Sequence, residues 1–136
     1  MQYYGAGIQA CYRGPRLYDT DETKKVVKET IDWYKQYRAI LNTDIIHLRR
    51  PDGRDWDGIM HVSPTLKEKG LVMLYNPLKE AISRKIKLPL YYTGLTKEAK
   101  IRIEQGKPTN YLLNRDYTVE IEIKLPAEGY TWLVIE

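Results

Sequence analysis

Three aspartates around a tryptophan offer the most direct acid/base chemistry in this sequence. Asp52, Asp55 and Asp57 lie within seven residues, and Trp56 stands between the last two. Glycosidases use two carboxylates about 5 to 9.5 Å apart, depending on stereochemistry. Asp55 and Asp57 on one side of a strand would be about 6.5 to 7 Å apart at their backbones. They are therefore an alternative acid/base pair, although Trp56 would point to the opposite face.

A structural explanation competes with this chemistry, and we favour it. The aspartates would form a charged turn, neutralised by the nearby Arg49, Arg50 and Arg54. The same carboxylates could hold Ca²⁺, but their spacing does not match that of an EF-hand loop.

The remaining reactive side chains form no recognisable motif. His47 and His61 lack a local ligand pattern, so we expect a hydrogen-bonded structural role rather than a metal pair. Cys11 is the only cysteine, which excludes an intrachain disulfide, and we expect an inert thiol. The glycines form no phosphate-binding pattern after a strand. The sequence predicts no metal and no cofactor.

The aromatic content is skewed, with 12 Tyr and 3 Trp but no Phe. Tyr and Trp combine an apolar face with a polar edge, which suits contacts with sugar rings. Aromatic residues are also common in β-sheets, so packing within the fold is the ordinary alternative. The candidates for a sugar-stacking surface are Tyr91, Tyr92, Tyr111, Tyr117, Tyr130 and Trp132.

Size and charge exclude several classes of function. A chain of 136 residues fits one domain. The net charge of +4 is spread along the chain, and the longest basic run is a pair, so we expect no nucleic-acid partner. No apolar run is long enough to span a membrane, and the first residues lack the features of a signal peptide. We expect no membrane partner.

A long helix is predicted in the first third of the sequence. Asp21 is a suitable N-cap, and no Gly or Pro occurs from Glu22 to Leu41. Apolar side chains recur at steps of three and four over a wide stripe. This width predicts burial on more than one side, part of it against a partner outside this chain. We expect the preceding residues 1–20 to form a loop with a short strand.

After residue 42 the period of the pattern changes to two. Residues 70–75 are continuously apolar, as expected for a central strand, and residues 117–125 alternate strictly. The other predicted strands cover 45–48, 56–62, 82–88, 99–104, 109–113 and 130–135. The sequence thus predicts a mainly β fold: an antiparallel β-sandwich (43–136) preceded by one long α-helix (within 1–42).

Several segments resemble the C-terminal region of bacterial glycoside hydrolases related to the α-galactosidase (melibiase) group. Tyr34, Lys35, Tyr37 and Arg38 match a "YKxYR" pattern at the end of the family's last barrel helix. The segments 44–55, 70–77, 89–95 and 129–132 are similar to the all-β domain that follows. The resemblance implies that residues 1–42 correspond to the end of a TIM barrel and residues 43–136 to the C-terminal domain.

The same resemblance implies a function without catalysis. The family's catalytic carboxylates lie on earlier barrel strands, which have no counterpart here, so we expect the chain alone to be inactive. It would be an accessory domain that packs on and stabilises the catalytic barrel, or self-associates when isolated. The alternative is an autonomous carbohydrate-binding module.

The resemblance also has implications for position and compartment. It places the loop after the last barrel strand near a sugar site, which gives as carbohydrate-proximal residues Tyr12, Arg13, Arg16, Tyr18 and Asp19. A parent enzyme that degrades polysaccharide would be exported, to the periplasm or beyond. The sequence itself leaves the compartment open.

Overall fold

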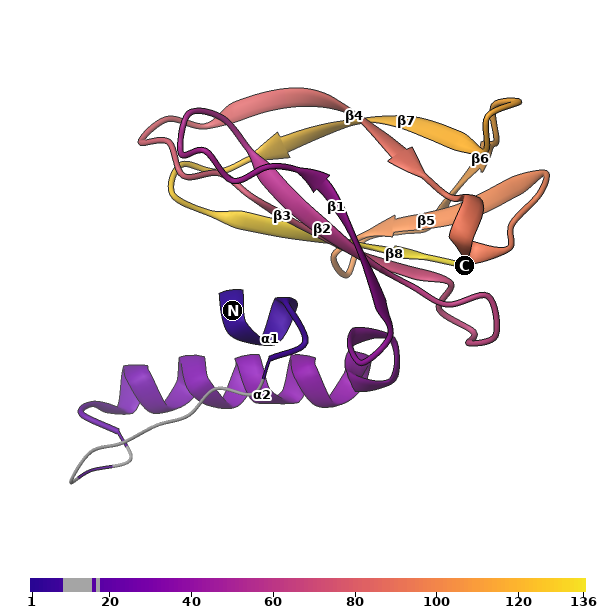
Figure 1. The fold of residues 1–136 in the computed structure, drawn as a ribbon. Coiled ribbons are helices and arrows are strands. Elements are labelled where there is room, and N and C mark those ends of the chain that lie inside the picture. The colour runs from indigo at the N-terminus through magenta and orange to yellow at the C-terminus, as the bar shows by residue number, and fades with distance from the viewer. Residues whose placement is uncertain (9–15, 17) are drawn as a thin grey trace.

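The computed structural model describes residues 1–8, 16 and 18–136. In this part of the chain, eight strands form two antiparallel sheets that face each other, and two α-helices lie outside them (Figure 1). The mainly β fold with one long preceding helix is confirmed.

The larger sheet has six strands, and every neighbouring pair is antiparallel. In spatial order its strands are β1 (Asp44–Arg49), β2 (Asp57–Val62), β3 (Gly70–Tyr75), β8 (Tyr130–Ile135), β5 (Glu98–Ile103) and β6 (Thr109–Leu112). The smaller sheet pairs β4 (Ile82–Pro89) with β7 (Thr118–Leu125). The sandwich is therefore strongly asymmetric.

The main core lies between the two sheets. Strand β7 turns Val119, Ile121, Ile123 and Leu125 inward, as its alternation predicts, because successive side chains of a strand point to opposite faces. Its other face is solvated and charged: Glu120 pairs with Lys85 across the sheet at 2.7 Å. The outer face of the small sheet is thus polar.

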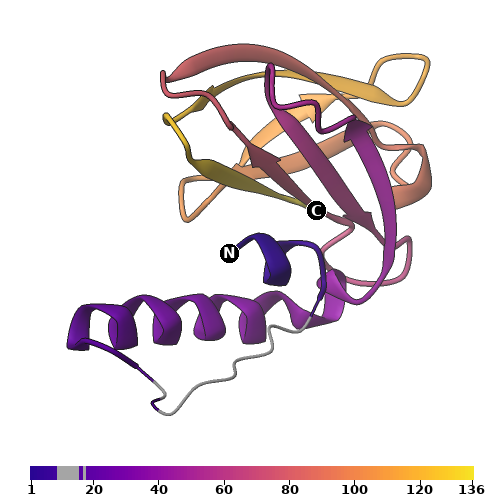
Figure 2. The same ribbon diagram turned by 60° about the vertical axis from the view of Figure 1, so that its left-hand side comes forward.

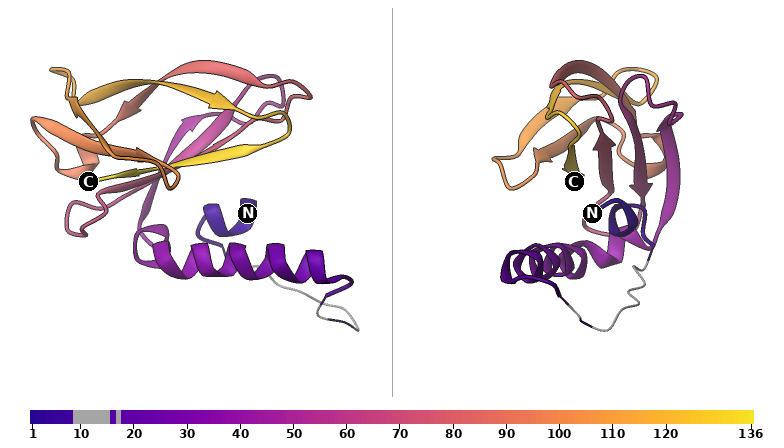
Figure 3. Two further views of the ribbon diagram at one scale, coloured as in Figure 1. Left: turned by 180° about the vertical axis from the view of Figure 1, so that it is seen from behind. Right: turned by 90° about the vertical axis from the view of Figure 1, so that its left-hand side faces the viewer.

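A second, smaller core lies on the opposite side of the six-stranded sheet. Helix α2 (Asp21–Leu41) and the short α1 (Gln2–Gly5) cover this face, as Figures 2 and 3 show. Its buried members are Trp33, Tyr37, Ile40, Leu41, Leu71, Met73 and Val134. Strand β3 is buried on both faces, as predicted for residues 70–75, because it contributes to both cores.

Two local predictions were wrong. The N-cap of α2 is Thr20 rather than Asp21, because the Thr20 hydroxyl accepts a hydrogen bond from the Thr23 amide at 3.1 Å. Residues 2–5 form helix α1, where we expected loop and strand. Beyond the predicted strand 82–88, β4 ends at Pro89, and residues 91–93 form a 3₁₀ turn (η1) that ends at Gly94, whose φ of 76° favours glycine.

Candidate functional site

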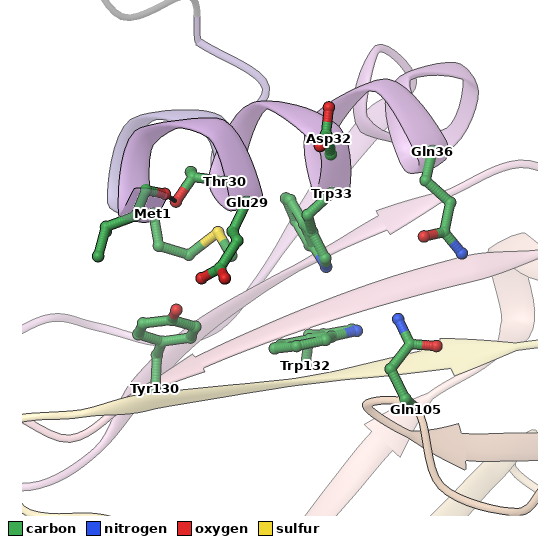
Figure 4. Close-up of a pocket in the computed structure, with 10 residues that line it drawn as sticks. Met1, Glu29, Thr30, Asp32, Trp33, Gln36, Gln105, Tyr130 and Trp132 are labelled. Carbon is green, nitrogen blue, oxygen red and sulfur yellow. Dashed lines mark hydrogen bonds between the residues drawn. The ribbon is translucent and has the colours of Figure 1, made fainter. Parts of the chain in front are cut away.

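A cleft of about 590 Å³ separates α2 from β8 and is lined with aromatic side chains (Figure 4). Tyr130 and Trp132 form its floor. They are two residues apart on one strand, so their rings lie on the same face of the sheet. Their ring centroids are 6.4 Å apart and their planes differ by 28°. Trp33 points from α2 toward this floor and meets Trp132 edge-on at 5.7 Å.

Polar side chains surround these rings. Glu29 points from α2 toward Tyr130, and Gln36 faces Gln105 across the other end of the cleft (Figure 4). Gln105 belongs to the hairpin between β5 and β6, where Arg102 donates a hydrogen bond to its side-chain oxygen at 3.3 Å. Asp32 points away from the cleft and pairs with Lys28.

Two buried donors at this site have no acceptor among the described residues. They are the Nε1–H groups of Trp33 and Trp132. Buried donors are normally satisfied by protein or water. The inner part of the cleft is therefore chemically polar as well as aromatic.

A second cleft of about 540 Å³ shares Tyr130 and includes Asp57 and Tyr75. Burial, aided by the charge of Asp57 and by Tyr130, raises the pKa of Tyr75 to about 12. Burial likewise raises the pKa of Asp57, and Arg49 only partly offsets this effect. The Tyr75 hydroxyl has no hydrogen-bond partner within the described residues.

Helix α1 is fixed on the sheet by a close backbone approach. A Cβ at Gly5 would lie 2.5 Å from the Tyr75 hydroxyl, so only glycine fits there without movement. His61 Nε2 donates a hydrogen bond to the Gly5 carbonyl at 2.7 Å. Burial lowers the pKa of His61, and interactions with the Gly5 carbonyl and the backbone of Thr43 partly oppose this shift. In the described chain, His61 Nδ1 has no hydrogen-bond partner of normal geometry.

The acid/base candidates lie in different surroundings. Asp55 lies before β2 rather than on it, and pairs with Arg84 at 3.1 Å. Asp57 is the first residue of β2 and lines the second cleft. Asp52 pairs with Arg49 at 3.0 Å, as the charged-turn interpretation expects. Catalysis by Asp55 and Asp57 stays a prediction.

The carbohydrate-proximal candidates fall in the least described part of the chain. Tyr12 and Arg13 lie outside the described residues, as does Cys11. Arg16, Tyr18 and Asp19 are described and exposed. Their proximity to a sugar site stays a prediction.

The six candidate aromatics separate into three groups. Tyr111 packs against the main core. Tyr91, Tyr92 and Tyr117 form an exposed cluster, but Tyr91 is nearly perpendicular to both neighbours, at 88° and 79°. Tyr130 and Trp132 alone lie side by side with similar ring planes.

Sequence reasoning missed the partners that turn these two rings into a cleft. Trp33 falls within the wide apolar stripe predicted for the long helix, and nothing in the sequence places Gln105 of a hairpin loop opposite Gln36 of a helix. Among residues 1–8, 16 and 18–136, no group of three or more His, Cys, Asp or Glu side chains could hold a metal ion. In the described chain, no helix is both long and apolar enough to cross a membrane.

Comparison with known proteins relates this fold to parts of larger chains. The sequence matches no protein-family model and no curated protein. The structure is similar to AmyP in complex with maltose (TM-score 0.54, 8% identity, 84% of this chain and 20% of that chain). A variant of AmyP in complex with maltotriose gives a TM-score of 0.53 at 9% identity, over 90% of this chain and 23% of that chain.

A pullulanase from Bacillus acidopullulyticus gives a TM-score of 0.41 at 13% identity, over 83% of this chain and 14% of that chain. These neighbours are glycoside hydrolases, but at such identities the likeness is one of fold alone. The chain spans about a fifth of the length of the AmyP chains. None of the three is an α-galactosidase, so the relation to that group stays a proposal.

Proposed function

We propose that this chain is a non-catalytic accessory domain of a glycoside hydrolase and that it packs on a catalytic domain through helix α2. One observation carries this proposal: within the described residues, α2 packs into the hydrophobic core along only half its length. Its buried residues, Trp33, Tyr37, Ile40 and Leu41, all lie in the C-terminal part. In the N-terminal part, the side chain of Val26 is 61% exposed.

A second apolar stripe on α2 supplies the surface for such packing. Val27 and Ile31 are one turn apart and lie on the flank of the helix that also carries Tyr34. Both are half-buried, and neither packs against the two hydrophobic cores. Tyr34 contacts Tyr4 of α1 at a ring distance of 5.0 Å. Helices on protein surfaces are stabilised mainly by packing, so an apolar stripe that lies outside both cores of the described chain favours a partner.

The other large surface suits solvent better than a partner. The outer face of the β4–β7 sheet carries alternating charges, such as Lys87 paired with Asp116 at 2.6 Å. The fold shared with parts of larger glycoside hydrolase chains supports an accessory role. The relation to α-galactosidases, given by the "YKxYR" pattern of α2, belongs to this proposal.

The test is the size of the isolated chain in solution, by light scattering coupled to gel filtration. We expect self-association through the stripe, and a shift to monomer in Ile31→Lys. Ala39→Lys is the matched control, because it adds the same charge at an exposed position on another side of α2. A wild-type chain that stays monomeric at all concentrations, with Ile31→Lys no different, would contradict the proposal.

A further inference from the structure

We infer that the cleft between α2 and β8 is a binding site for a neutral sugar, with a pyranose ring stacked on Tyr130 and Trp132. The floor provides the first requirement. Its two rings lie side by side at 6.4 Å and 28°, and Trp33 meets Trp132 edge-on, so the open part of this apolar floor is centred on the exposed Tyr130. One face of a pyranose is formed by C–H groups, which suits such a surface. The exposed Tyr91 and Tyr117 do not offer this arrangement, because their rings meet at 79°.

The second requirement is a set of hydrogen-bonding groups for hydroxyls. Glu29 can accept, and the amides of Gln36 and Gln105 can both donate and accept. A purely apolar occupant would desolvate these groups without replacing their hydrogen bonds. A polyhydroxylated ring satisfies both kinds of surface.

The charge of the cleft favours a neutral ligand over an anionic one. Glu29 and Asp32 are its charged lining residues, and both are acidic. Asp32 is paired with Lys28 and points outward, whereas Glu29 lies 3.9 Å from the ammonium of the exposed Lys25. None of the described residues that line the cleft is basic. Phosphate or uronate groups would therefore find no cationic side chain among them.

The size of the site suits more than one ring. A volume of about 590 Å³ lies in the range of ordinary ligand pockets. Tyr130 also borders the second cleft of about 540 Å³, so the two clefts share this ring as a wall. The site is thus suited to an oligosaccharide.

The site is independent of the domain-packing proposal. With about 100° of rotation per residue, Glu29 and Gln36 fall on one flank of α2 and Val27 and Ile31 on the other. A domain that covers the apolar stripe leaves the mouth of the cleft open. Ile31→Lys should change self-association and leave sugar binding unaltered, so the two proposals fail separately.

The test is titration of the full chain with maltotriose, cellotriose, xylotriose, mannotriose and α-1,6-galactobiose, each to about 10 mM. The indole N–H resonances of the three tryptophans are followed by NMR. We expect at least one probe to shift the signals of Trp33 and Trp132. Trp56 packs against the main core and serves as the internal control, so its signal should stay in place.

Variants identify the surface that binds. Tyr130→Ala should lower the affinity for the sugar that binds about tenfold, since it removes half of the stacking floor. Gln105→Ala should lower this affinity less, and Tyr91→Ala, at an exposed ring outside the cleft, should leave it unchanged. An unaltered Trp56 signal shows that each variant is folded. The inference is overturned if no probe shifts Trp33 or Trp132, or if Tyr130→Ala and Gln105→Ala both bind like the wild type.

Discussion

The two faces of the six-stranded sheet differ in how they are buried. The face toward β4 and β7 is covered by aliphatic side chains whose exposure is at most a few per cent, including Leu74, Ile86 and Leu133. The face toward α1 and α2 is covered by a mixture of aromatic and aliphatic side chains, borders two clefts and leaves indole and hydroxyl donors without partners in the described chain. One sheet thus carries a closed structural core on one side and an open, polar-aromatic layer on the other. The open side is the one with room for function.

The largest effect is expected in the closed core. Leu133→Ala should lower the free energy of unfolding by about 3 kcal/mol, because Leu133 is fully buried and its neighbours are fixed by two sheets. Chemical denaturation followed by circular dichroism measures the change. Leu112→Ala is the control, since Leu112 is 81% exposed, and should be nearly neutral. Equal losses for the two variants would refute the assignment of the core.

A smaller loss is expected on the helix side. Trp33→Ala should cost about 2 kcal/mol, below the usual value for a buried tryptophan, because the ring borders an open cleft. The loss should appear mainly as faster amide exchange in α2, with β3 and β8 little changed. Lys35→Ala, on the exposed surface of the same helix, is the control. A loss as large as that of Leu133→Ala, spread over both sheets, would erase the distinction between the two faces.

The buried histidine should make the helix side sensitive to pH. The pKa of His61 is lowered in the folded state by burial, so the unfolded chain binds the proton more readily. Stability should therefore fall as the pH drops below the ordinary value of 6.5 toward the lowered folded value, with a slope of at most about 1.4 kcal/mol per pH unit. His61→Gln keeps a donor for the Gly5 carbonyl and should flatten the profile between pH 7 and 5, as measured by denaturation at each pH. A slope unchanged in this variant would place the titration elsewhere.

The smallest effects are expected at the aspartates. Asp57→Asn should raise stability at neutral pH by less than about 0.5 kcal/mol, because burial raises the pKa of Asp57 and so disfavours its charge. The gain should shrink as the pH falls below that pKa and vanish below the ordinary value of 3.8, where the carboxyl is protonated in both states. Asp52→Asn should lower stability at neutral pH, since the Arg54 amide and Arg49 lower the pKa of Asp52 and so favour its charge. Thermal denaturation at neutral and acid pH measures the two changes in stability. A change of the same sign in both variants would contradict the environments described for the two aspartates.

The sequence predicts one face of the sheet much better than the other. Strict alternation in residues 117–125 and the apolar run in 70–75 are local signals, and both strands are confirmed. The open layer depends on contacts between distant segments. Gly5 meets Tyr75, His61 reaches the Gly5 carbonyl, and Gln105 faces Gln36, none of which a periodic pattern encodes. The division at residue 42 stays a prediction, and the structure shows that the two parts share the core formed by α2 and the outer face of the sheet.

Native-state hydrogen exchange of the chain tests most directly the claim that one face is closed and the other open. We predict the slowest exchange in β3 and β8, intermediate protection in the C-terminal half of α2, and fast exchange in its first three turns, residues 21–31, where packing on the sheet is weakest. Uniformly slow exchange along all of α2 in a monomeric chain would contradict the account, because the helix would then need no further partner.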